Sequence, residues 1–293
     1  MKTSLGDRSF LIVNYAFLTI WLLIIIYPLI YIVSASFSDP YAVKSGRVLL
    51  FPVRPTLRAY RAVFMYPDVA IGYFNSFFYA IVGTAINLFV TVVAAYPLSR
   101  KDFYGHRAIM GIFVFTMLFS GGLIPFFIVV RNLGMYNTRL ALLIPGALSV
   151  WNMILARTYF KVNIPDELYE AAVIDGGNDV RFIWSVVLPL SGPILAVVGL
   201  FYAVGHWNSY FNALIFLKRK NLFPLQIFLR NILLLNQVDL DRMEDIEEMV
   251  MKQDLVDLLK YALIIVASVP VLLIYPFVQK YFVRGVLLGS LKG

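Results

Sequence analysis

The sequence lacks cysteine and has few charged residues for its length. None of the 293 residues is cysteine, which excludes disulfides, thiolate nucleophiles and cysteine metal sites. Asp, Glu, Lys and Arg together make up 14%, whereas a typical soluble domain has about 25%. Hydrophobic residues reach 60%, above the roughly 45–50% of soluble domains. This composition is typical of a protein that lies in a lipid bilayer.

The common motifs of catalysis and nucleotide binding are also absent. There is no G-x-x-x-x-G-K-[ST] loop to cradle phosphates, and neither G-x-S-x-G nor H-E-x-x-H occurs. Glu167 and Glu170 are better explained as a solvated or partner-facing edge than as an acid–base pair. His206 is one of two histidines and has no nearby ligands to complete a metal site. We therefore expect a non-catalytic chain that binds no metal and no cofactor of its own.

Six apolar stretches are long enough to cross a membrane, which takes roughly 20 residues. They cover approximately 10–34, 74–96, 108–130, 140–160, 191–215 and 261–282. Gly121, Gly122 and Pro125 interrupt the third stretch, and Pro145 lies near the start of the fourth. The pattern predicts an all-α polytopic membrane protein with six transmembrane helices.

The predicted spans divide the chain into three segments. Residues 1–73 hold the first span and a long loop, and 74–283 form the core. Residues 284–293 form a tail. The first span has about 24 apolar residues and no cleavage site close behind it, so we expect it to remain in the mature protein.

The distribution of positive charge does not settle the orientation. Six spans place both termini on one side, together with the loops 97–107 and 161–190. That side carries eleven of the 25 Lys and Arg residues, and the other side carries fourteen. The net charge of +8 is spread over many loops, which suits a membrane surface better than a nucleic acid.

No Asp, Glu, Lys or Arg lies in the middle of a predicted span, which argues against a proton-driven carrier or a voltage sensor. The spans carry neutral polar and aromatic residues instead, Asn75 and Asn87 among them. Such groups suit an uncharged, hydroxyl-rich solute such as a sugar, although buried Asn residues also commonly link helices to each other. The residues that we assign to a possible solute path are Asn152, His206, Trp207, Asn208, Tyr210 and Asn212.

The segment 164–193 is predicted to fold as two short helices around a glycine turn. Pro165 suits the first helical position, where its missing N–H costs nothing. The run Asp175-Gly176-Gly177 indicates a turn, and Asn178 is a plausible cap for the second helix. Pro189 and Pro193 should end or bend that helix. Its apolar residues fall on one face, which packs either on the chain's own spans or against a partner: Val180, Ile183, Trp184, Val187 and Leu188.

The loop 236–260 is acidic and amphipathic. It is expected to be a solvated helix lying over the protein. The alternative is a docking surface for an extracytoplasmic partner.

Several motifs resemble those of ABC-importer permeases. Glu170-Ala171-Ala172, Asp175-Gly176 and Leu188-Pro189 match the family's EAA motif, E-A-A-x-x-D-G followed by L-P. Further similarities lie in 95–100 (AYPLSR), 120–125 (SGGLIP), Asn137-Thr138, Trp207-Asn208 and the tail 275–293. The chain is similar to the inner subunit of maltose permeases, in the branch for complex oligosaccharides. It departs from the family pattern at Tyr96-Pro97 and at Gly177.

The resemblance implies an importer with several partners: a second homologous permease, two ATPase subunits, an extracytoplasmic solute-binding protein and a sugar. ATP and magnesium would be used by the ATPase subunits, not by this chain. The loop 161–190 would seat in a groove of the ATPase, which places both termini in the cytoplasm. The residues implied in coupling are Glu170, Ala171, Ala172, Asp175, Gly176 and Gly177. The alternative is a self-sufficient secondary carrier of a neutral solute.

Overall fold

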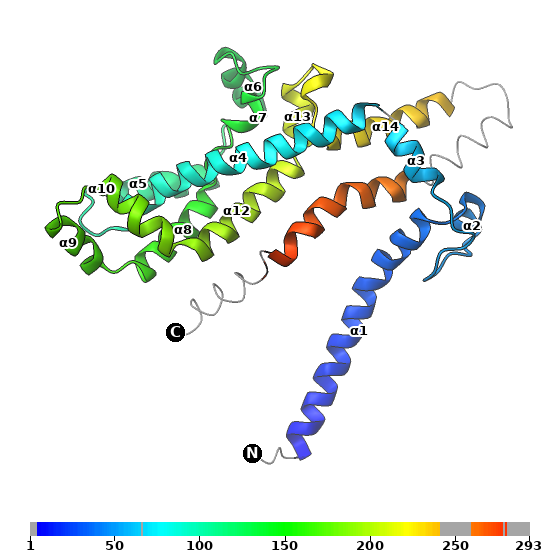
Figure 1. The fold of residues 1–293 in the computed structure, drawn as a ribbon, viewed down its shortest axis with the longest axis horizontal. Coiled ribbons are helices and arrows are strands. Elements are labelled where there is room, and N and C mark those ends of the chain that lie inside the picture. Colours follow the sequence, from blue (N-terminus) through cyan, green and yellow to red (C-terminus); the bar gives the residue numbers. More distant parts are fainter. Residues whose placement is uncertain (1–4, 66, 241–258, 278, 280–293) are drawn as a thin grey trace. The chain divides into compact units, whose positions relative to one another are not determined.

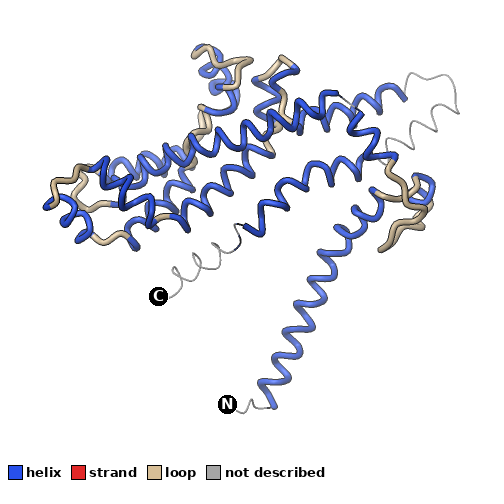
Figure 2. Tube along the Cα trace, viewed as in Figure 1, coloured by secondary structure: helices blue, strands red, loops and turns tan. Residues whose placement is uncertain are grey.

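The computed structural model describes residues 5–65, 67–240, 259–277 and 279, and helices are the only regular elements in these ranges (Figure 2). The chain divides into two compact units. Residues 1–69 and 229–270 form the first, and residues 70–228 and 271–293 form the second. The expected all-α fold is confirmed for the described residues.

The first unit begins with α1, Leu5–Ser36, whose 32 residues contain the first predicted span. Two short helices follow, α2 (Pro40–Lys44) and α3 (Arg58–Met65). Serine side chains fold the loop after α1 back onto the end of that helix. The Ser34 hydroxyl donates to the Leu50 carbonyl at 2.7 Å, and Ser38 Oγ accepts the Val53 N–H at 3.0 Å.

The second unit is organised around α4, Pro67–Ser99, a 33-residue helix that starts at the end of the first unit (Figure 1). The helices that follow it are α5 (His106–Leu118), α6 (Leu123–Asn132), α7 (Leu140–Leu143), α8 (Val150–Asn163), α9 (Asp166–Ile174), α10 (Asp179–Phe182), α11 (Leu188–Leu190), α12 (Gly192–Trp207) and α13 (Phe211–Phe216). A π-helical turn, Ile183–Val187, joins α10 to α11. A 3₁₀ turn, Lys220–Leu222, precedes α14 (Leu225–Leu240).

Two apolar clusters hold the second unit together at opposite ends of α4. One packs the end of α4 against α8 and the segment after α9, through Tyr96, Phe160 and Phe182. The other packs the first half of α4 against α7 and α13, through residues such as Tyr79 and Ala213. Each end of α4 is therefore packed against other helices of the second unit.

Three helices in the described ranges are long and apolar enough to cross a membrane: Gly6–Ser36, Asp68–Ser99 and Leu259–Phe277. Two bent pairs raise the number to five if each pair is one span. The pair α5 and α6 bends by 114°, and the segment Asp179–Leu190 bends by 85° against α12. The first bend lies where Gly122 has a φ of +84°, as the glycines of the predicted third span suggest.

The remaining predicted span, 140–160, is divided. A loop containing Pro145 and Gly146 separates α7 from α8. With 14 residues, α8 is about 21 Å long, less than the roughly 30 Å of a bilayer core. The described part of the chain therefore contains three to five spans by length and composition.

Candidate functional site

The segment after α8 folds as the predicted helix–turn–helix. We call α9 (Asp166–Ile174) the coupling helix. It ends in a Schellman motif, in which Gly176 has a φ of +73° and the Gly177 N–H donates to the Ala172 carbonyl at 2.8 Å. Asn178 caps α10, since its side chain accepts the Arg181 N–H at 2.8 Å. The turn is therefore fixed by backbone and cap hydrogen bonds.

One detail of this segment differs from the prediction. Pro165 lies one position earlier than expected, at the N-cap of the coupling helix, with an extended backbone conformation. The expected end at the prolines is confirmed, since the helical segment ends at Leu190, one residue after Pro189. The bend comes at Ser191, two residues before Pro193.

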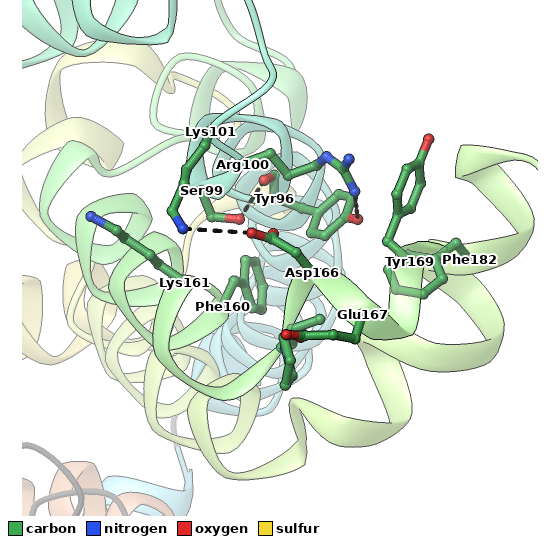
Figure 3. A pocket seen from close by; sticks show the side chains of 12 residues that line it. Tyr96, Ser99, Arg100, Lys101, Phe160, Lys161, Asp166, Glu167, Tyr169 and Phe182 are labelled. Atoms are coloured by element: carbon green, nitrogen blue, oxygen red, sulfur yellow. Dashed lines mark hydrogen bonds and ion pairs between the residues drawn. The ribbon is translucent and has the colours of Figure 1, made fainter. Parts of the chain in front are cut away.

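The coupling helix is clamped to the end of α4 by one arginine (Figure 3). The Arg100 guanidinium carbon lies 3.5 Å from the centre of the Tyr169 ring. Its Nη1 donates to the Tyr96 hydroxyl at 3.2 Å. Its Nε and Nη2 donate to the two carboxylate oxygens of Asp102 at 2.8 and 2.6 Å. Arg100 therefore contacts α4 through Tyr96, the coupling helix through Tyr169 and the loop after α4 through Asp102.

The electrostatics of this clamp follow from its hydrogen bonds. The bonds from Arg100 hold the pKa of the Asp102 carboxyl below its ordinary value. The same pair raises the pKa of Arg100, which stays charged. The Tyr169 hydroxyl donates to Asp179 Oδ1 at 2.8 Å, and this bond raises the pKa of Tyr169. Tyr169 is therefore held on its ring face by Arg100 and at its hydroxyl by Asp179.

A cavity of about 320 Å³ lies beside this clamp, between the end of α4, the end of α8 and the start of the coupling helix (Figure 3). Lys101 Nζ lies 3.6 Å from Asp166 Oδ2 on its wall. Arg157 of α8 donates through Nε to the Leu98 carbonyl at 2.8 Å. These polar contacts join α8, α4 and the coupling helix.

The outer face of the coupling helix is exposed and mixes acidic with apolar residues. Glu170 and Asp175 are exposed carboxylates. Ile174 is 86% exposed and Val173 is 50% exposed. Ala171 is exposed beside them, whereas Ala172 packs partly against the core. The outer face of the coupling helix therefore presents carboxylates beside exposed aliphatic side chains.

The apolar residues predicted on one face of the second helix are divided between the core and the exposed surface. Val187 is fully buried, and Ile183 and Leu188 pack against the same core. Val180 and Trp184 remain 64% and 62% exposed. The π-helical turn Ile183–Val187 shifts the spacing of these residues from that of an ideal α-helix.

A second cavity, of about 340 Å³, lies between α4, α8, α12 and α13. We call it the polar chamber. It includes three of the residues that the sequence assigned to a solute path, Asn152, His206 and Asn212. Asn87, Ser149 and Ser209 add further polar groups to its wall. Neutral hydrogen-bonding groups therefore surround a space between the spans.

Asn87 links two walls of the chamber. His206 Nε2 lies 2.7 Å from Asn87 Oδ1, and Asn87 Nδ2 donates to the Gly146 carbonyl at 2.7 Å. Because an amide oxygen only accepts, this contact requires the proton on Nε2 of His206. Gly83 faces the same ring, and a Cβ there would overlap the imidazole. His206 is thus a positioned hydrogen-bonding residue.

Other predicted solute-path residues lie elsewhere. Trp207 is buried against Phe77 and Tyr73, with ring centroids 5.2 and 6.1 Å apart. Asn208 is the exposed C-cap of α12. Tyr210 packs against the apolar cluster at the first half of α4.

The sequence reasoning missed Tyr202, which orders the chamber. Its hydroxyl lies 2.8 Å from Thr91 Oγ1 and accepts the Ser149 N–H at 3.0 Å. Nothing in the sequence separates Tyr202 from the other aromatic residues of the spans. Tyr169 was missed as well, although an aromatic residue in a short exposed helix was a usable signal. Most of the acidic loop 236–260, and the tail from 280, lie outside the described residues.

Known proteins resemble this chain over nearly its whole length. No family model matches the sequence. A permease of the polygalacturonan/rhamnogalacturonan transport system of Bacillus subtilis, YtcP, is 40% identical over 288 residues, which are 98% of this chain and 99% of that one. Protein LplC of the same organism is 37% identical over 293 residues, which are 100% of this chain and 98% of that one.

A solved structure has the same fold. It is a bacterial ABC transporter involved in the import of the acidic polysaccharide alginate. One of its chains matches with a TM-score of 0.85 and 37% identity, over 96% of this chain and 99% of that one. Full-length identity at this level, together with the shared fold, shows common descent along the entire sequence. The chain belongs to the carbohydrate-uptake family of ABC transporter permeases, which are non-catalytic membrane subunits.

Proposed function

We propose that this chain is one of two permeases in a binding-protein-dependent importer of an oligosaccharide. It would cross the cytoplasmic membrane six times, with the divided segment α7–α8 as one crossing and both termini in the cytoplasm. Two ATPase subunits would bind on the cytoplasmic side and consume ATP and magnesium there. An extracytoplasmic binding protein would deliver the sugar to the opposite side.

The observation that carries this proposal is the exposed face of the coupling helix. Glu170 and the aliphatic residues Val173 and Ile174 face away from the protein's own core. The Schellman motif at Gly176 and the Arg100 clamp hold this face rigid. A rigid helix that presents a carboxylate beside apolar groups suits a groove in another protein, where aliphatic side chains are buried and Glu170 is paired.

Movement of the ATPase subunits would reach the spans through the contacts of this helix. Tyr169 and Arg100 join it to α4, Tyr159 of α8 donates to the Leu190 carbonyl at 3.1 Å, and α12 follows directly after the bend. A displacement of the coupling helix would then shift α4, α8 and α12, three of the helices that line the polar chamber. The chamber would open alternately to each side of the membrane.

Substitution of the exposed face tests this proposal. Glu170→Lys and Ile174→Asp should each reduce co-purification of the ATPase subunits and ATP-driven uptake, while membrane insertion and thermal stability stay unchanged. Tyr104→Asp is the matched control, because Tyr104 is 98% exposed in the loop before α5. Normal assembly and uptake in both variants would refute the coupling role.

A further inference from the structure

In the segment 70–228, acidic residues occur at one end only, whereas basic residues occur at both ends. Residues 70–228, all of which the structure describes, contain six acidic residues. All six lie in the loop after α4 or around the coupling helix: Asp102, Asp166, Glu167, Glu170, Asp175 and Asp179. The end with the coupling helix carries six basic residues: Arg100, Lys101, Arg107, Arg157, Lys161 and Arg181. The other end of this segment carries five basic residues and no acidic one: Arg131, Arg139, Lys218, Arg219 and Lys220. We call these five residues the basic rim.

Asn137 brings the two parts of the basic rim together. Its backbone N–H donates to the Phe216 carbonyl at 2.8 Å. Its side-chain Oδ1 accepts the N–H groups of Lys218 and Arg219 at 2.9 and 3.0 Å. Asn137 has a φ of +59°, which Asn tolerates better than most residues. The loop after α6 and the loop after α13 are therefore one surface.

Arg139 anchors this surface to the start of α4. Its Nη2 donates to Asn75 Oδ1 at 3.3 Å, and its guanidinium carbon lies 4.2 Å from the centre of the Phe78 ring. Asn75 and Ser99 are 24 residues apart on α4, about 36 Å along a helix. That distance spans a bilayer core, so with α4 as a membrane span the basic rim and the coupling helix would lie on opposite faces of the membrane. Figure 1 shows α6, α7 and α13 away from α9.

The basic rim is continuous with the polar chamber. Phe216 lines the chamber and lies two residues before Lys218. Ala141 also lines it and lies two residues after Arg139. Arg131, Lys218, Arg219 and Lys220 are exposed. A solute that entered from this side would pass four exposed cations before it reached the neutral polar groups.

We propose that the basic rim selects oligosaccharides that carry carboxylates, namely chains of uronic acid residues. This inference rests on the proposed import function and names its substrate class. Lys and Arg side chains bind carboxylates through charge-assisted hydrogen bonds, and an entrance lined by one sign of charge concentrates ligands of the opposite sign. The neutral groups of the chamber would then bind the sugar hydroxyls.

Uptake by the complete importer in proteoliposomes tests this proposal with two trisaccharides. Trigalacturonate and α-1,4-linked galactotriose differ only at C6 of each sugar, which is a carboxylate in the first and a hydroxymethyl group in the second. The triple variant Lys218→Gln, Arg219→Gln, Lys220→Gln should raise the KM for trigalacturonate by about tenfold or more and leave kcat unchanged. Lys218→Arg with Lys220→Arg should retain uptake. Arg107→Gln removes an exposed charge on the other face and is the control.

Three results would overturn the proposal. The first is a wild-type importer that imports galactotriose but not trigalacturonate, and the second is an equal loss for both sugars in the triple variant. The third is a loss of affinity for the binding protein, measured on the same samples, because the rim would then be a docking surface. With any of these results, normal association of the ATPase subunits with the permease would still support the proposed import function. Failed association in the wild type would overturn both.

Discussion

The guanidinium of Arg100 stacks on the ring of Tyr169, with its carbon 3.5 Å from the ring centre. One residue comes from the end of a membrane-spanning helix and the other from the coupling helix. The same arginine also holds Tyr96 and Asp102. Arg100 therefore joins the coupling helix to the end of α4, beside the Lys101–Asp166 ion pair and the packing of Tyr96 on Phe182.

Removal of the Tyr169 ring should loosen this connection. Tyr169→Leu is expected to lower the unfolding free energy by about 0.5–2 kcal/mol, because a cation–π contact and its hydrogen bond to Asp179 are lost. ATP-driven uptake should fall more than ATPase association, since the docking face is kept. Thermal unfolding and uptake are compared with Tyr104→Leu, which should match the wild type. An uptake loss no larger than that of the control would contradict a role in coupling.

The Arg100–Asp102 pair predicts a pH dependence. The pKa of Asp102 is depressed in the folded state, so its contribution to stability is present above the ordinary aspartate pKa of about 3.9. That contribution is lost as the pH falls through the depressed value. The difference in thermal midpoint between wild type and Asp102→Asn should therefore be largest near neutral pH and shrink in acid. A difference that stays constant down to about pH 2 would show that the carboxylate charge is not involved.

A methyl group at Gly83 should displace His206. The Cβ of Gly83→Ala would overlap the imidazole ring, so the ring must move and its bond to Asn87 breaks. We expect a loss of about 1–3 kcal/mol in unfolding free energy, together with reduced uptake. Gly111→Ala is the matched control, because nothing lies within 4 Å of its added Cβ. Equal stability of the two variants would mean that the chamber does not need this ring position.

The two asparagines at the end of α12 and the start of α13 should differ in their effect on transport. Asn212 lines the polar chamber, whereas Asn208 caps α12 outside it. Asn212→Ala should raise the KM for the sugar, and Asn208→Ala should leave it unchanged. Uptake kinetics in assembled complexes decide this. The opposite ranking would move the solute path to the Asn208 side of the helix end.

Local sequence signals predicted the coupling segment because its structure is local. The turn at Gly176 and the cap at Asn178 follow from residue types that favour those backbone conformations. The three long spans were predictable for the same reason, since their length and apolar character are properties of continuous sequence. The divided segment around Pro145 was not, because apolar composition does not reveal where a helix stops.

The contacts between distant residues could not be predicted. Asn87 meets His206 across 119 positions, and Thr91 meets Tyr202 across 111. Packing of α4 against α12 creates both pairs, so a single sequence does not distinguish these residues from others in the spans. The same holds for Trp207, whose polar neighbours in sequence suggested a solute path while its ring packs against Phe77.

Cross-linking at Ile174 shows whether the coupling helix contacts the ATPase subunits. The natural sequence has no cysteine, so Ile174→Cys creates a single reactive thiol on the most exposed aliphatic residue of the coupling helix. We expect a covalent permease–ATPase product in the assembled importer, with Tyr104→Cys giving none. No product at Ile174, in a complex that still imports sugar with ATP, would contradict the claim that this helix seats in the ATPase.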